Sequence, residues 1–510
     1  MVRQCQNRKV REFEIMEWLL SKKDQERLLL HRYLLAQSKN AVLIKDVMNA
    51  LNWSRYMVLQ NVESLRVDYR EVGDADFCYL ELMDSNRAMQ VSHIQTISDT
   101  ALRGFYIRNS LSFDILMDVF LEIAQSNEMI AFKHSSSTTV ARVTKVELNE
   151  KLAKFNIHIS DDYRLLGDET NVRILLFELL YLVYAEEPVP FPVAVRQMSK
   201  HVEELVSVSQ PVRATVRKAF NIFFGIWYTR LTNGHYLEVN ASDNVFKPYA
   251  ELTQSAKHIL SKLREIMSVS FPTNRLEIDA ELRFGLGSLY SLGVGVGTYR
   301  VANLSIEIAQ KFNDIYGDVA AVYEEFFGLK LSDPELELMQ RALFSLNLRI
   351  LCFRQNGINY PSNREVSRRM FPIHTAFTEQ VIARVAPHFN MTTKEVDVAV
   401  FNEYFNTFVL VLNTSTILPV VTLTIDMIDM PAMEQLLREH VMSWKSVNLN
   451  ITTTFTAKTD VYISDVQLDD QVPGFAWRAI PEPAEETELH DLLIKMTLKR
   501  FKEMTGKLSD

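Results

Sequence analysis

The sequence predicts a mainly α, multidomain protein with tandem winged helix-turn-helix modules, two all-helical domains and a small C-terminal α/β domain. Its 510 residues exceed the roughly 250–300 that a single core usually supports. Apolar residues recur at helical spacing over most of the chain, and the period changes to that of strands after Thr414. A capped helix followed by a strand-like segment occurs twice near the start. We therefore expect five domains, at residues 1–90, 91–168, 169–275, 276–410 and 411–510.

The first helix-turn-helix is predicted at residues 43–68, LIKDVMNALNWSRYMVLQNVESLRVD. Asn52 tolerates the left-handed turn conformation, and Ser54 can cap the second helix. Val58, Val62 and Leu65 mark the inner face of that helix. The remaining polar side chains can reach phosphates and base edges in a major groove. They are Ser54, Arg55, Tyr56, Gln60, Asn61 and Ser64. A helical hairpin with a polar outer face is the alternative interpretation.

Two segments complete this first module. A supporting helix is expected at residues 24–37, before the helix-turn-helix. After it, YREVGDADFCYLELM has strand-like content around Gly73 and Asp74, which predicts a β-wing.

The second module is predicted around HSSSTTVARVTKVELNEKL, residues 134–152. Serines supply N-cap chemistry, and an inner stripe is expected at Val140, Val143, Leu148 and Leu152. The candidate DNA contacts are Ser137, Thr138, Thr139, Arg142 and Lys145. The segment FNIHISDDYRLLGDE would form the wing, and the short, poorly amphipathic NEMIAFKH the middle helix. An ordinary capped amphipathic helix is the alternative.

Long apolar helices dominate the next part of the chain. One set runs from Asn171 to about Met267, and another from near Leu276 to about Thr407. Glycines between Phe284 and Arg300 predict a turn-rich stretch, which lacks the signature of a phosphate-binding loop. After Thr414, a strand, a helix, further strands and a closing helix predict an α/β domain of about 95 residues.

The charge distribution is compatible with DNA binding by the first part of the chain. Net charge is −9, from 55 Lys and Arg against 64 Asp and Glu. Residues 1–160 hold 21 of these cations and 20 of the anions, which leaves 34 against 44 elsewhere. The acidic excess therefore lies outside the proposed DNA-binding modules.

Other sequence features predict a cytoplasmic protein. The three cysteines are too few for a disulfide framework or a zinc cluster. The sequence shows no secretory signal and no apolar run of the roughly 18 residues that a membrane span needs.

The motif LGDETNVR, Leu166–Arg173, precedes a long aromatic-rich helix. Together with the domain order, it resembles the Mga/AtxA family of virulence regulators in Gram-positive pathogens. The resemblance implies a homodimeric transcriptional regulator of virulence or carbohydrate-metabolism genes that binds double-stranded promoter DNA. It also implies two phosphotransferase-system (PTS) regulation domains, an enzyme-IIB-like C-terminal domain and a transient phosphocarrier partner.

The same resemblance directs attention to two histidines as phosphorylation sites. His201 follows Arg196 and Lys200, and His374 lies at a helix start with arginines upstream. The alternative is a partly exposed histidine without a regulatory role. The C-terminal domain lacks the cysteine of a phosphocysteine enzyme IIB, because none follows Cys352. An interaction or dimerisation surface is therefore expected there.

No catalytic motif is found, since HExxH, GxSxG and P-loop signatures are absent from the sequence. We expect no enzymatic activity and no cofactor. An RNA-binding antiterminator, which can carry paired regulation domains, and a phosphotransfer component of sugar uptake are the competing functions. The helix-turn-helix at residues 43–68 disfavours the first, and the missing cysteine disfavours the second.

Overall fold

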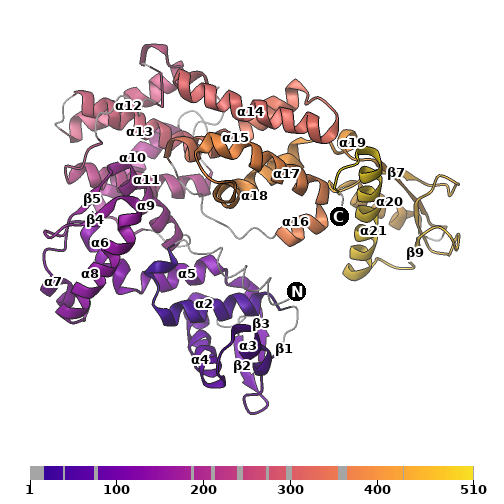
Figure 1. The fold of residues 1–510 in the computed structure, drawn as a ribbon, viewed down its shortest axis with the longest axis horizontal. Coiled ribbons are helices and arrows are strands. Elements are labelled where there is room, and N and C mark those ends of the chain that lie inside the picture. The colour runs from indigo at the N-terminus through magenta and orange to yellow at the C-terminus, as the bar shows by residue number, and fades with distance from the viewer. Residues whose placement is uncertain are drawn as a thin grey trace. The chain divides into compact units, whose positions relative to one another are not determined.

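The computed structural model confirms the mainly α fold and contains two compact units, residues 1–299 and 300–510 (Figure 1). Each unit is described separately. The structure describes residues 16–37, 41–73, 79–184, 189–207, 213–237, 245–247, 249–271, 275–293, 301–353, 364–428 and 430–508.

The first module is a winged helix-turn-helix. Its elements are α2 (Lys22–Leu35), β1 (Ala41–Leu43), α3 (Ile44–Leu51), α4 (Arg55–Val72), β2 (Tyr79–Met83) and β3 (Ala88–Ser92). The strands form an antiparallel sheet in the order β1-β3-β2. Asn52 has φ 56° and ψ 44°, and the Ser54 side chain accepts a hydrogen bond from the Met57 amide at 3.2 Å. The predicted turn and cap are confirmed.

The wing of this module begins later than the sequence predicts. Residues YREV belong to α4 instead of a strand, because Tyr69 continues the buried face of that helix and is 1% exposed. Gly73 is the C-cap of α4, and residues 74–78 lie outside the described part of the chain. The turn of the wing falls at residues 84–86, whose φ values are 51°, 54° and 64°. Asp, Ser and Asn tolerate this left-handed conformation to different degrees, Asp and Asn best.

The second module repeats this plan with a two-stranded wing. Its elements are α5 (Asp99–Arg108), α6 (Leu111–Phe120), α7 (Asn127–Lys133), α8 (Thr138–Leu152), β4 (Ile157–Ile159) and β5 (Leu165–Gly167). The middle helix α7 forms at NEMIAFK as expected, with Ser126 as its cap. Strands β4 and β5 pair antiparallel, with His158 opposite Leu166. Gly167 has φ 147°, and a Cβ there would lie 2.2 Å from the Asn156 carbonyl oxygen, so the wing requires glycine.

Long helices complete the first unit. They are α9 (Glu169–Val183), α10 (Val193–Ser207), α11 (Ala214–Thr232), α12 (Gln254–Ser270) and α13 (Arg275–Ser291). The predicted turn-rich stretch is wrong for its first part, because α13 continues to Ser291. A Cβ on Gly285 would lie 2.5 Å from the Trp227 ring, so this glycine permits close helix packing. Residues 294–300 lie outside the described residues.

The second unit contains a helical part and an α/β part. The helices of the first part are α14 (Ile306–Phe327), α15 (Asp333–Phe353), α16 (Arg364–Met370), α17 (Pro372–Val385) and α18 (Thr393–Val411). The second part contains α19 (Thr414–Ile417), β6 (Val420–Asp426), α20 (Pro431–Met442), β7 (Asn448–Thr452), β8 (Val461–Ser464), β9 (Gly474–Ala476) and α21 (Pro483–Thr505). These strands form a parallel sheet in the order β7-β6-β8-β9. The change to strands after Thr414 is as predicted.

Apolar side chains of α20 and α21 pack on this sheet. Leu437 of α20 and Leu493 of α21 share a buried core with Leu423 and Ile463 of the strands. Phe501 of α21 also stacks on Phe326 of α14, with ring centroids 5.7 Å apart. The division into five domains stays a prediction. Helix α13, which the sequence assigned to the fourth domain, lies in the first unit.

Candidate nucleic-acid interface

Helix α4 presents an exposed polar face at its first two turns. Tyr56 is 75% exposed, and Gln60 is also exposed. Ser54 is exposed as the cap of the helix, and Ser64 is half-buried. Tyr56 and Gln60 therefore have the hydrogen-bonding groups and the reach that base-edge contacts need.

Asn61 does not share this face, and its prediction as an outward-facing residue is wrong. The side chain is 6% exposed and donates a hydrogen bond to the Met57 carbonyl oxygen at 3.0 Å. Asn61 follows Val58 by three residues and precedes Leu65 by four, so it lies on the buried stripe. The same amide nitrogen lies 3.5 Å from Glu26 Oε2 of α2, so Asn61 supports the packing of α4 on α2.

Arg55 connects the start of α4 to the wing. Its guanidinium donates to the carbonyl oxygens of Asn86 at 3.0 Å and Ser85 at 3.4 Å. Because both acceptors lie in the wing turn, Arg55 aligns the helix and the wing as one surface. It remains exposed, so it can also face a phosphate.

Helix α8 presents a different face from the one the sequence predicts. Val140 is 48% and Val143 45% exposed, whereas Ala141 and Leu148 are buried. The predicted inner stripe is therefore wrong at both valines and right at Leu148 and Leu152, which is also buried. The exposed residues near the start of α8 are Ser137, Thr138, Thr139 and Arg142. Val146, at 53% exposure, extends the aliphatic part of this face.

Lys145 connects α8 to the second wing. Its ammonium lies 4.0 Å from the centroid of the Tyr163 ring, a cation–π contact. The Tyr163 hydroxyl donates to Asn127 Oδ1 of α7 at 2.5 Å. Burial lowers the pKa of Lys145, an effect that Asp161 and Asp162 oppose. Lys145 thus has a structural partner in the wing, as Arg55 has in the first module.

Other contacts hold the second helix-turn-helix together. Lys133 Nζ lies 2.5 Å from Asp118 of α6, and His134 Nε2 lies 2.8 Å from the same carboxylate. The Asn149 side chain on α8 accepts from the Ile159 amide at 2.6 Å and donates to its carbonyl at 2.9 Å. The wing strand β4 is therefore fixed to the recognition helix.

A cluster of charged residues connects the second wing to helices α9, α11 and α13. We call Glu169, Arg173, Arg230 and Glu281 the charge cluster. Arg173 is 1% exposed and forms two hydrogen bonds with Glu281, at 2.6 and 3.0 Å. Arg230 pairs with Glu169 at 2.6 Å and donates to the Leu165 carbonyl of β5 at 3.0 Å. The motif Leu166–Arg173 thus supplies two of the four charges, and α11 and α13 supply the others.

A comparison with known families identifies this region. Residues 95–180 match the family model of the Mga helix-turn-helix domain. The match confirms the predicted resemblance to the Mga/AtxA family. It spans α5 to most of α9, including the exposed face of α8 and part of the charge cluster. The chain is a DNA-binding transcriptional regulator. No curated protein matches it.

The two histidines predicted as phosphorylation sites have different environments. His201 is exposed on α10. His374 is 1% exposed at the start of α17 and contacts the Phe371 ring. Burial lowers the pKa of His374 to about 4, so this imidazole is neutral at pH 7. A phosphoryl donor can reach His374 only after α17 separates from its neighbours.

The part of the chain that the structure describes lacks two further features. None of the helices described is long and apolar enough to cross a membrane. Within the same residues, His, Cys, Asp and Glu side chains form no group of three or more that could hold a metal ion.

Proposed function

We propose that the chain regulates virulence or carbohydrate-metabolism genes by placing both winged modules on double-stranded promoter DNA. The main support is that each module has a capped recognition helix whose first turns are exposed beside a wing. In both modules a cation of that helix contacts the wing, Arg55 in the first and Lys145 in the second. The residues available for DNA are Ser54, Arg55, Tyr56, Gln60, Ser64, Ser137, Thr138, Thr139, Arg142 and Lys145.

The test is a binding competition on the purified full-length chain. A labelled promoter duplex would be challenged with unlabelled duplex of the same sequence and with the corresponding RNA transcript at one fixed salt concentration. We expect the duplex to compete at least about tenfold better than the RNA. Equal or stronger competition by the RNA would support the antiterminator alternative instead.

Phosphorylation through the sugar phosphotransferase system is the second part of the proposal. A phosphohistidine adds close to two negative charges, which an exposed helix surface can accept. His201 meets this condition in the folded chain, whereas His374 requires local opening. We expect incubation with the phosphocarrier and its phosphoryl donor to label His201 faster than His374. Peptide mass spectrometry of the acid-labile label would measure both, and faster labelling of His374 would contradict this order.

Self-association is the third part, and the C-terminal domain is its proposed surface. Several large apolar side chains of this domain are highly exposed, including Ile428 at 81%, Leu436 at 62% and Ile480 at 80%. Exposed apolar side chains mark an interaction site where they form one contiguous patch. Deleting residues 415–510 should weaken a homodimer, which sedimentation velocity would measure. A truncated chain that dimerises like the parent would exclude this surface.

A further inference from the structure

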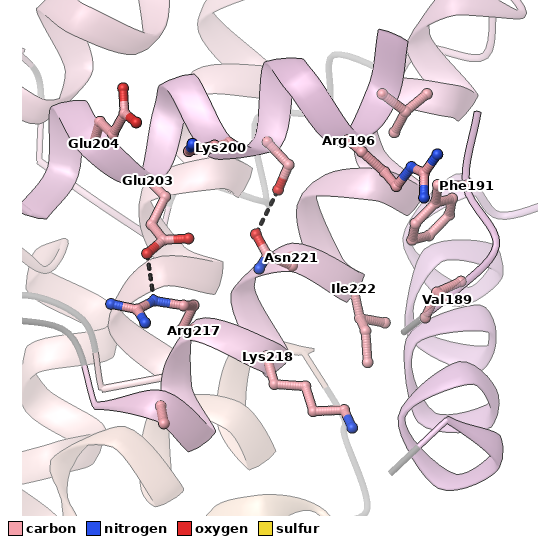
Figure 2. Close-up of a pocket in the computed structure, with 13 residues that line it drawn as sticks. Val189, Phe191, Arg196, Lys200, Glu203, Glu204, Arg217, Lys218, Asn221 and Ile222 are labelled. Atoms are coloured by element: carbon pink, nitrogen blue, oxygen red, sulfur yellow. Dashed lines mark hydrogen bonds and ion pairs between the residues drawn. The ribbon is translucent and has the colours of Figure 1, made fainter. Parts of the chain in front are cut away.

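A cavity of about 680 Å³ lies between α10 and α11 in the first unit (Figure 2). Sites for small organic ligands typically measure about 300–1,000 Å³. The two helices that form the cavity are joined in space by a hydrogen bond from Ser199 Oγ to Asn221 Oδ1, at 2.7 Å. The volume is therefore large enough for a ligand with a ring or a short chain.

Part of the cavity wall is apolar and well packed. Val189, Phe191 and Val195 are each 7% exposed, and Ile222 is 2% exposed. Figure 2 shows Val189, Phe191 and Ile222 on one side of the cavity. A fixed apolar wall favours a ligand with an apolar body, because contact with it removes both surfaces from water.

The rest of the lining is rich in cations. Arg196 and Lys200 lie one turn apart on α10, and Arg217 and Lys218 lie in the first turns of α11. The lining also includes Glu203 and Glu204, so it holds four cationic side chains and two carboxylates.

One of these carboxylates already has a partner. Arg217 Nε lies 2.5 Å from Glu203 Oε1, as the dashed line in Figure 2 shows. Ala214, the first residue of α11, also lines the cavity, so the positive end of that helix dipole adds to the field. The lining is thus electrostatically suited to an anion.

We propose that this cavity binds a small organic anion, a carboxylate or phosphate ester with an apolar body. Its charged group would pair with Arg196 and Lys200, and its body would rest on Phe191 and Ile222. His201 follows Lys200 in sequence but is not among the residues that line the cavity. The site is therefore distinct from a phosphorylation site at His201.

Isothermal titration calorimetry with 1-naphthyl phosphate tests this proposal on the full-length chain. Inorganic phosphate and 1-naphthol separate the charged and apolar contributions. We expect saturable binding of 1-naphthyl phosphate, at least about tenfold tighter than either comparison compound. Absence of binding at millimolar concentration, or equal binding of all three compounds, would overturn the proposal.

Variants locate the binding in the cavity. The double variant Arg196→Gln/Lys200→Gln should weaken binding about tenfold or more, and both positions are exposed, so the fold should be kept. Ala214→Trp places an indole ring in the cavity and should weaken binding. Arg213→Gln removes one exposed cation beside the cavity and should leave binding unchanged, as should His201→Ala. Binding that survives the double variant, or is lost in Arg213→Gln or His201→Ala, would contradict the assignment.

Discussion

The two recognition helices share a serine cap but present different chemistry to solvent. Helix α4 exposes Tyr56 and Gln60, which can form hydrogen bonds, whereas α8 exposes Val143 and Val146 beside Arg142. Amides read donor and acceptor patterns of bases, and aliphatic groups contact the thymine methyl. If both helices contact DNA as proposed, hydrogen bonds should dominate in the first module, and apolar and phosphate contacts in the second.

The modules also differ in how they are anchored. Asp68 of α4 accepts hydrogen bonds from Arg27 at 2.7 Å and from the Tyr106 hydroxyl at 2.6 Å. Burial raises the pKa of Asp68, against the opposing effects of Tyr106 and Arg27. The second module instead uses the charge cluster, in which Arg173, Arg230 and Glu281 are more deeply buried than Asp68.

The largest expected effect is on stability, and it compares these anchors. Glu281→Ala leaves two buried arginines, Arg173 and Arg230, with Glu169 as their one carboxylate partner in the charge cluster. It also removes the acceptor of the Trp227 indole N–H, so the total cost should be about 3–5 kcal/mol. Asp68→Ala should cost only about 1–3 kcal/mol, because Arg27 is 20% exposed to water and also keeps Asp24 as a partner. Hydrogen exchange of peptides from each module would measure both, with the exposed Glu265→Gln as control. A larger loss for Asp68→Ala would reverse the comparison.

The second prediction concerns mild acid and the first module. Burial lowers the pKa of His31 to about 4, and its ring contacts the Tyr69 hydroxyl at 2.7 Å. His31 binds a proton near pH 6.5 in the unfolded chain but only near pH 4 in the folded chain. The contribution of His31 to the stability of this module should therefore fall by about 3 kcal/mol between these pH values and change no further below them.

A difference measurement isolates this histidine. His31→Leu removes the titrating group, so the first module of the variant should lose less stability over the same pH range. Hydrogen exchange of α2 measures this loss in both proteins. His374, which has the same lowered pKa, is unchanged in both proteins and cancels. Parallel loss of stability in parent and variant would show that another group causes the acid sensitivity.

The third prediction separates two neighbouring amides on α4. Gln60→Ala should weaken DNA binding by about 1–3 kcal/mol without a change in stability, because the side chain is exposed. Asn61→Ala should lower stability and leave the DNA affinity of the folded protein unchanged. Fluorescence anisotropy at fixed salt measures affinity, and thermal unfolding measures stability. Unchanged affinity in Gln60→Ala would remove this face of α4 from the interface.

The smallest expected effect concerns the aliphatic face of α8. Val143→Thr keeps the side-chain shape and should cost about 0.8 kcal/mol or less in DNA affinity. Replacing thymine by uracil in the duplex should weaken the parent by a similar amount and the variant by less. If both proteins lose affinity equally on uracil DNA, Val143 does not contact a thymine methyl.

Local signals in the sequence predicted the modules well. Asn52, Ser54 and Ser137 act within a few residues of themselves, so their roles at turns and caps can be inferred without the rest of the fold. The faces of the helices were harder to predict. Val140 and Val143 are apolar yet exposed, and Asn61 is polar yet buried, so polarity gave the wrong face at all three positions.

The charge cluster could not be predicted as a site. Arg173 and Glu281 lie 108 residues apart, and no spacing or periodicity relates them. The sequence motif at residues 166–173 marked the right segment but not its partner. The α10–α11 cavity could not be predicted from the sequence either, although Arg196 and Lys200 were noted as cations near His201. Their position on a cavity wall depends on how α11 packs against α10.

We propose that both modules occupy one stretch of DNA, and the variant Arg142→Ala provides the sharpest test. Arg142 is exposed on α8 with the reach of a phosphate contact, so its loss should lower the logarithmic salt slope by about 0.9. Arg341→Ala makes the same charge change outside the DNA-binding modules and serves as control. Footprinting and binding at several salt concentrations would be compared for both variants. We expect a footprint shortened at one end and a reduced salt slope for Arg142→Ala alone. A parental footprint and slope in that variant would show that the second module does not bind beside the first.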